Sequence, residues 1–162
     1  MPRYLYLLRH AQSADKQTGQ TDKDRVLTPV GMAEAKAVGF FLKENAVKPE
    51  LIITSSAVRA KTTSQEVARV LSYNEEKIEI TDDLYEATII TFFHTLSNVD
   101  DSINSVLLVG HNPIITYFAD HITRQQNSFH TAEILALKFE AVNWKGLQKE
   151  NAEIISRFRP TV

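Results

Sequence analysis

The sequence predicts an α/β fold, a three-layer α/β/α sandwich in which helices cover both faces of a mostly parallel sheet. Short apolar runs alternate along the chain with segments of helical periodicity, which is typical of strand–helix units. The main runs are continuous rather than alternating, as expected of strands that are covered on both faces. Two late apolar segments favour strands that pair at an antiparallel edge of the same sheet.

The first unit begins with a strand at residues 4–8, where five apolar or aromatic side chains follow one another. The polar stretch at residues 12–25 predicts a long loop, which is either a flap that contacts a partner or simply solvated. Thr28 and Pro29 form a helix start, because threonine is a good N-cap and proline is favoured in the first turn. The helix is expected to run to about Asn45. Its apolar side chains recur at helical spacing: Val30, Ala33, Ala37 and Phe41.

Five later runs predict the remaining strands, at residues 51–54, 78–80, 106–109, 132–139 and 152–158. Three helical segments lie between them. Ser55 or Ser56 is expected to cap the first of these helices, and Asn112-Pro113 to open the last. Their apolar stripes are Ala60, Thr63, Val67 and Val70, then Ile89, Phe92, Phe93 and Leu96, then Ile115, Phe118, Ala119 and Ile122. The aromatic residues expected in the core are Phe40, Phe92, Phe93 and Phe118.

Length and composition narrow the class of protein. The 162 residues predict one domain over residues 1–162. Eighteen Lys and Arg against 20 Asp and Glu give a net charge of −2, which argues against nucleic acid or an anionic membrane as partner. The absence of cysteine excludes disulfides and a thiol nucleophile. With neither a signal-peptide pattern nor an apolar run of ~20 residues, we expect a cytoplasmic protein.

Charged side chains follow three of the predicted buried strands. Arg9 and His10 end the first strand, Arg59 comes one turn into the helix after the second, and His111 follows the fourth. Because ligands of parallel α/β sheets bind outside the carboxyl ends of the strands, we expect these four residues to converge. Helix N-termini beside them would add N–H donors and positive dipole ends. The sequence therefore predicts a cationic pocket for a compact anion, and forked guanidinium donors match phosphate.

A histidine in such a pocket predicts phosphoryl transfer. Neutral imidazole is a good nitrogen nucleophile and is available near pH 7, so His10 or His111 is able to attack phosphorus while the arginines stabilise the transferred group. The other histidine, protonated, would donate to the same oxygens. No His-x-His or helical His-x-x-x-His pair occurs. We therefore predict no metal and no cofactor.

Two further residues are candidates with open alternatives. Glu86 lies just past the third predicted strand and is the best-placed carboxylic acid to protonate a leaving group, although a solvated first-turn glutamate is equally compatible with its position. Ser13 is a candidate donor to the phosphate, or a solvated loop residue. Neither alternative is decided by the sequence.

Four segments resemble the motifs of the histidine phosphatase superfamily, which includes the cofactor-dependent phosphoglycerate mutases. They are "LLRHAQS", "RVLTPVGMAEA", "SSAVRAKTT" and "LVGHNP", and they occur in the family's order. The resemblance implies a phosphoglycerate mutase-like fold and a phosphorylated His10 as intermediate. It also implies that Arg9, Arg59 and His111 bind the phosphoryl group.

The short length resembles the SixA-type branch, whose characterised members remove phosphate from phosphohistidine in signalling proteins. Ala11 stands where mutase-like members have glycine, and residues 14–16 lack their asparagine. The chain also has no room for the insertions that close over a phosphosugar. A phosphohistidine-carrying protein is therefore the expected substrate. A small phosphomonoester, or phosphate binding without turnover, remains the alternative.

Overall fold

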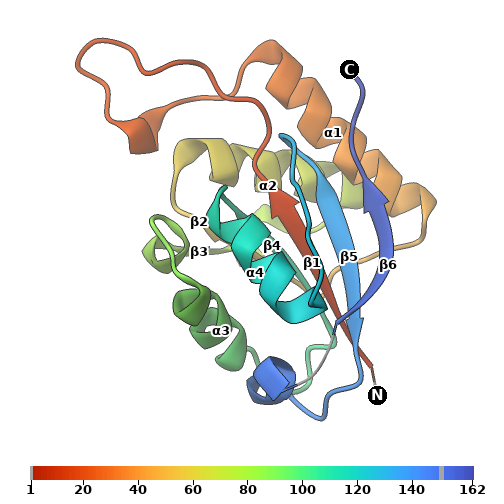
Figure 1. Ribbon diagram of the computed structural model, residues 1–162. Helices are drawn as coiled ribbons and strands as arrows, with labels where there is room; N and C mark the ends of the chain where they lie inside the picture. The colour runs from red at the N-terminus through yellow and green to blue at the C-terminus, as the bar shows by residue number, and fades with distance from the viewer. Residues whose placement is uncertain (1, 150–151) are drawn as a thin grey trace.

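The computed structural model describes residues 2–149 and 152–162, and its framework is one six-stranded sheet (Figure 1). The strands are β1 (Arg3–Arg9), β2 (Leu51–Ser55), β3 (Glu79–Thr81), β4 (Ser105–Gly110), β5 (Ile134–Phe139) and β6 (Glu153–Phe158). Their order across the sheet is β3-β2-β4-β1-β5-β6. The pairs β3–β2, β2–β4 and β4–β1 are parallel, whereas β5 pairs antiparallel with both β1 and β6. The predicted α/β class with an antiparallel edge is confirmed.

Four α-helices cover the sheet: α1 (Pro29–Glu44), α2 (Val58–Leu71), α3 (Ile89–Ser97) and α4 (Ile114–Thr123). Helices α1 and α2 lie on one face and α3 and α4 on the other, as Figure 1 shows. Four 3₁₀ turns complete the elements: η1 (Asp22–Asp24), η2 (Glu75–Lys77), η3 (Asp82–Leu84) and η4 (Trp144–Lys149). None of the helices in the described residues has the length and apolar character needed to cross a lipid bilayer.

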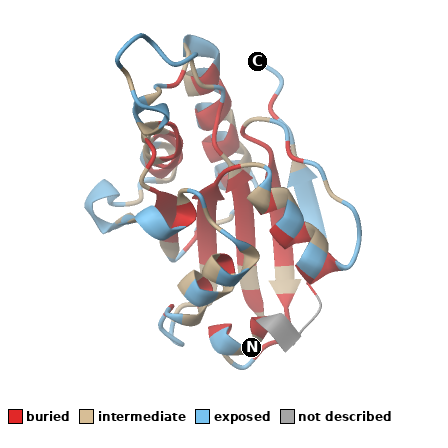
Figure 2. Ribbon diagram, turned by 60° about the vertical axis from the view of Figure 1, so that its left-hand side comes forward, coloured by how far each residue is buried: buried red, intermediate tan, exposed pale blue. Residues whose placement is uncertain are grey.

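Each face of the sheet has its own apolar core. Successive side chains of β1 point to opposite faces, so Leu5 and Leu7 join the core under α3 and α4, whereas Tyr6 and Leu8 join the core under α1 and α2. The central strands are almost entirely buried, as the red ribbons of Figure 2 show. This double burial explains why the runs at β1 and β4 are continuously apolar.

Helix α1 begins where the sequence predicts, since the Thr28 side chain accepts a hydrogen bond from the backbone N–H of Gly31. Its inward face differs from the expected stripe, because Val30 and Ala33 are exposed. The buried face combines small residues with Glu34 and Leu42, and consists of Gly31, Glu34, Ala35, Val38, Gly39 and Leu42. Close approach to α2 selects this face: a Cβ on Gly39 would lie 2.7 Å from Cβ of Val70.

Two other expectations are wrong. Phe40 is exposed rather than in the core, because it follows Gly39 on the outer side of α1. Neither serine caps α2 through its side chain: the N-cap is Ala57. The backbone N–H of Ala57 instead donates to Oγ of Ser55 just before the helix begins. The hydroxyl of Ser56 donates to Asp82.

Candidate active site

The carboxyl ends of β1, β4 and β2 lie side by side and bring together the residues that follow them. His10 directly follows β1, His111 directly follows β4, and Arg59 lies in the first turn of α2 after β2. The imidazole centroids of His10 and His111 are 5.1 Å apart. All three side chains are more than nine-tenths buried. The structure thus places two histidines and an arginine from three strand–helix units in one site.

His10 is held by its backbone and by its ring. Its N–H donates to the carbonyl of Gly110 at 3.0 Å, and its carbonyl accepts from the N–H of Ala132 at 3.1 Å. Nδ1 lies 2.8 Å from the carbonyl oxygen of Ala11. Because a carbonyl only accepts, Nδ1 carries the hydrogen and Nε2 of the neutral ring has a free lone pair.

Burial sets the protonation state of His10. Burial first, and then the positive charges of Arg59 and Arg9, lower the pKa of the imidazole to about 3, although the hydrogen bond to Ala11 acts in the opposite direction. The ring is therefore neutral near pH 7. The structure presents Nε2 of His10 as an unprotonated nitrogen in a cationic site.

His111 is neutral as well, whereas the sequence suggested a protonated donor. Burial first, and then the guanidinium of Arg59, lower its pKa to about 4. Nε2 lies 2.7 Å from Oγ of Ser55, and that oxygen already accepts from the N–H of Ala57 at 3.2 Å. We assign the Ser55 hydroxyl as the donor to Nε2, and this assignment puts the ring hydrogen on Nδ1. Nδ1 is buried without a hydrogen-bond partner among the described residues.

The two arginines are anchored differently. Arg9 Nη1 donates to the carbonyl of Phe129 at 3.0 Å, and Nδ2 of Asn112 donates to the same oxygen. Arg59 donates from Nη1 to the backbone oxygen of Asp22 at 2.8 Å and from Nη2 to its carboxylate at 3.0 Å. A guanidinium has five N–H donors, so Arg59 keeps three beyond these two bonds.

Asp22 is a site residue that the sequence does not reveal. It lies in η1, within the loop at residues 12–25, and its carboxylate also accepts from the Tyr85 hydroxyl at 2.7 Å and from Arg25 at 3.1 Å. The hydrogen bond from Tyr85, and then those from the two arginines, hold the pKa of Asp22 well below its usual range. These contacts cross 37 and 63 positions of sequence, so no local spacing marks them.

Buried polar groups fix the segment that follows His10. The N–H of Ala11 donates to Oγ1 of Thr63 at 3.0 Å, and the N–H of Gln12 donates to the carboxylate of Glu34 at 2.8 Å. Helix α1 approaches the same segment so closely that a Cβ on Gly31 would lie 2.1 Å from the carbonyl oxygen of Gln12. The sequence pattern placed Thr63 on an apolar stripe and gave no sign of this role.

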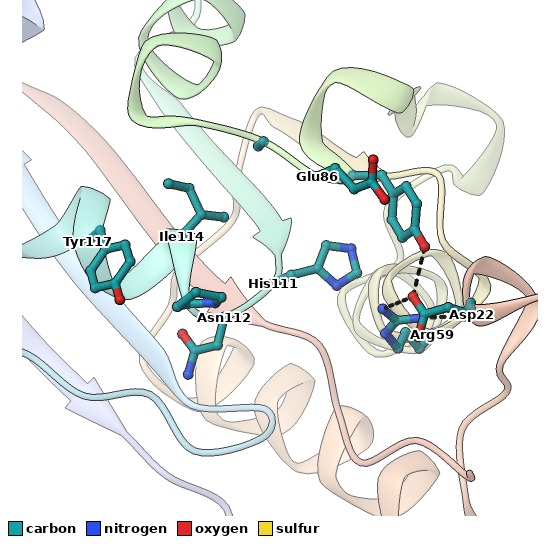
Figure 3. A pocket seen from close by; sticks show the side chains of 10 residues that line it. Asp22, Arg59, Glu86, His111, Asn112, Ile114 and Tyr117 are labelled. Atoms are coloured by element: carbon teal, nitrogen blue, oxygen red, sulfur yellow. Dashed lines mark hydrogen bonds and ion pairs between the residues drawn. The ribbon is translucent and has the colours of Figure 1, made fainter. Parts of the chain in front are cut away.

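A hollow of about 380 Å³ opens beside His111 and Arg59 (Figure 3). Its lining residues are Asp22, Arg59, Tyr85, Glu86, Ala87, His111, Asn112, Pro113, Ile114 and Tyr117. Glu86 is exposed here and has a left-handed backbone, with φ of 57°. Ser13 does not line this hollow, and its Oγ accepts from Arg25 at 2.9 Å. Within the described part of the chain, no three His, Asp or Glu side chains gather as a metal site.

Comparisons with known proteins agree with this arrangement. Residues 5–92, more than half of the chain, match the histidine phosphatase superfamily (branch 1). An uncharacterised protein of Mycobacterium tuberculosis is 30% identical over 112 residues, which are 69% of this chain and 67% of that protein. The mitochondrial serine/threonine-protein phosphatase PGAM5 of Xenopus tropicalis is 41% identical over 69 residues. That match covers 43% of this chain and only 24% of PGAM5.

Solved structures share the whole fold. A protein of Agrobacterium tumefaciens, provisionally assigned as the phosphohistidine phosphatase SixA, superimposes with a TM-score of 0.81 at 27% identity. The match covers 99% of both chains, so no large element of either is missing from the other. Motif order, sheet topology and these matches agree that this chain belongs to the histidine phosphatase superfamily (branch 1), in its SixA-type branch.

Proposed function

We propose that this chain is a phosphohistidine phosphatase that works through a phosphorylated His10. The observation that carries the proposal is the state of His10: a buried, neutral imidazole whose Nδ1–H is bound to Ala11, so that Nε2 is free beside Arg59 and His111. A site that only binds phosphate gains nothing from an uncharged nitrogen at that position. The state of His10 therefore favours turnover over binding alone.

In the first step, Nε2 of His10 forms a bond to phosphorus as the bond between phosphorus and the leaving group breaks. The leaving group takes the electron pair of that bond. Charge spreads over the three equatorial oxygens, where Arg9, Arg59 and Nδ1–H of His111 act as donors. Two guanidinium groups supply positive charge for this purpose, so the proposal includes no metal ion.

In the second step, water attacks phosphorus and the bond to Nε2 of His10 breaks. Nε2 regains its lone pair, the proton of the attacking water is lost to solvent or phosphate, and inorganic phosphate leaves. Because Nδ1 keeps its hydrogen bond to Ala11 throughout, the ring returns to its starting state.

The proposed substrate is a phosphohistidine side chain on another protein. The similarity to the SixA assignment supports this class, as does the size of the hollow, which is about 380 Å³. A phosphorylated side chain on a protein surface brings little more than the phosphoryl group and one ring into the site.

The test is a quenched reaction with a phosphotransfer protein that carries radiolabelled phosphohistidine. We expect label on the wild type that is lost in acid and kept in base, no label on His10→Ala, and normal label on the exposed-site control His94→Ala. Turnover should persist with a chelator present. Absence of label together with equal hydrolysis by His10→Ala would overturn the mechanism.

A second candidate is hydrolysis of a phosphoester, and Glu86 is the observation that favours it. Glu86 lines the same hollow as Arg59 and His111. Its left-handed backbone conformation is uncommon for non-glycine residues and frequent at functional sites. An ester oxygen needs a proton as it leaves. If wild type hydrolyses phenyl phosphate or a phosphoserine peptide faster than phosphohistidine, and Glu86→Gln removes that activity, the second candidate replaces the first.

A further inference from the structure

Asp22 is an anion placed at the rim of a phosphate site, and its side chain is 49% exposed. It lines the hollow together with Tyr85 and Arg59, and Figure 3 shows it beside Arg59. The hollow that Asp22 lines is also lined by Arg59 and His111 but not by His10. Asp22 is therefore on the outer side of the site, away from the attacking nitrogen. In an in-line displacement, that is the side from which the leaving group departs.

The hydrogen bonds of Asp22 leave one acceptor position open. One carboxylate oxygen accepts from Arg59 at 3.0 Å and from Tyr85 at 2.7 Å; among the residues that the structure describes, the other accepts only from Arg25, at 3.1 Å. A carboxylate has about four lone-pair positions. Three are used, so the fourth is free for a donor on the substrate.

We propose that Asp22 accepts a hydrogen bond from the ring N–H of a departing imidazole and so selects P–N over P–O substrates. The inference rests on the proposed function, since it concerns the leaving group of that reaction. A phosphorylated imidazole has a second nitrogen, one ring-width from phosphorus, and an ester oxygen has none. The carboxylate thus meets a donor on one class of substrate and the growing negative charge of an alkoxide on the other.

The bond changes balance without an external acid. The substrate ring carries a proton on its second nitrogen, bound to Asp22, when Nε2 of His10 attacks phosphorus. The P–N bond of the substrate breaks, its electron pair stays on the ring nitrogen, and a neutral imidazole departs with its N–H. His10 becomes a phosphorylated ring with a proton on Nδ1, bound to Ala11. The phosphoryl group thus passes between two similar imidazoles, each with its second N–H bound to an oxygen.

The side chains around Asp22, Tyr85 among them, suit a leaving group that is a planar ring. The Tyr85 hydroxyl holds Asp22, and the Tyr85 ring meets the His111 ring edge-on, with centroids 5.7 Å apart. Ile114 and Tyr117 line the same hollow beyond His111. An imidazole that enters between these side chains has apolar contacts for its faces, and its N–H reaches the Asp22 carboxylate that Tyr85 holds in place.

The experiment compares Asp22→Asn with wild type on phosphoimidazole and on phenyl phosphate, two substrates with ring-sized leaving groups. Asparagine keeps an acceptor for Arg59 but removes the charge. We expect the ratio of kcat/KM for phosphoimidazole to that for phenyl phosphate to fall at least about tenfold, the usual effect of losing a charge-assisted hydrogen bond. Asp24→Asn is the matched control, because Asp24 lies in the same turn and accepts from Thr21 rather than from Arg59.

The outcomes separate the two proposals. A fall in the ratio for Asp22→Asn with none for Asp24→Asn supports the selection by Asp22. Equal losses on both substrates would show that Asp22 only positions Arg59, which overturns the inference and leaves the proposed function standing. Failure of wild type to cleave phosphoimidazole or to label His10 would overturn the proposed function, and the inference with it.

Discussion

Replacing His10 with asparagine will reduce the stability that this protein loses on acidification. Burial lowers the pKa of His10 to about 3 in the folded chain, whereas an unfolded histidine has a pKa of about 6.5. Between these values the unfolded chain binds more protons, so the free energy of unfolding falls as the pH drops through this range. The contribution of His10 is fully present above pH 6.5 and is lost progressively toward pH 3.

The magnitude follows from the two pKa values. At pH 5.0 the unfolded ring is protonated and the folded ring is not, and the difference of about 1.5 pH units from 6.5 corresponds to roughly 2 kcal/mol. His111, with its pKa lowered to about 4, contributes roughly the same amount at this pH. We expect His10→Asn to recover about half of the loss that these two residues cause.

The assay is urea unfolding at pH 7.5 and pH 5.0, followed by the fluorescence of Trp144. This residue is the single tryptophan of the chain and is 1% exposed, so its emission reports loss of the core. Every other effect of pH on stability is shared by the variant and wild type, so the comparison between them cancels it. His94→Asn is the control, since His94 is exposed, and it should follow wild type.

If wild type and His10→Asn lose the same free energy between pH 7.5 and pH 5.0, burial does not keep His10 neutral. If the asparagine variant does not fold, the same comparison is made with His111→Asn, for which the expected difference is again about 2 kcal/mol.

Three further predictions concern residues around the site. Arg59→Ala should lower kcat by about 10²–10³-fold through lost charge stabilisation while circular dichroism stays unchanged, and an equal loss of folded protein would mean that Arg59 is structural. Ser55→Ala should lower kcat about tenfold or more because His111 loses the partner that orients its ring, and Ser55→Thr should restore most of it; equal kcat for Ser55→Ala and wild type would contradict this role. Gly31→Ala should lower the melting temperature by several degrees, since overpacking costs about 1–3 kcal/mol where its Cβ meets Gln12; an unchanged melting temperature would show that the segment after His10 yields easily.

The parts of this protein that the sequence predicts are those with a local signature. A strand buried on both faces requires a continuous apolar run, and β1 and β4 show one. Parallel strands place their carboxyl ends at one edge, so the convergence of His10, Arg59 and His111 follows from topology alone. No side-chain geometry is needed for either inference.

Other parts depend on packing that leaves no pattern in the chain. The inward face of α1 is formed by small residues such as Gly31 and Gly39, which have low hydrophobicity but allow close approach to Gln12 and Val70. Asp22 reaches Arg59 only through the path of a long loop. The neutral state of His111 depends on burial, which exists only after the fold has formed.

His10 and Asp22 lie in regions of different local stability. The backbone of His10 is hydrogen-bonded to Gly110 and Ala132. The reacting nitrogen belongs to the central strands, where amide exchange requires unfolding of the whole sheet. The segment with Asp22 is attached to the site by side-chain contacts of a half-exposed carboxylate rather than by sheet hydrogen bonds, and such a segment can open alone at a lower free energy. The proposed phosphoryl transfer is therefore expected to outlast the proposed discrimination between leaving groups when the protein is heated or mildly denatured.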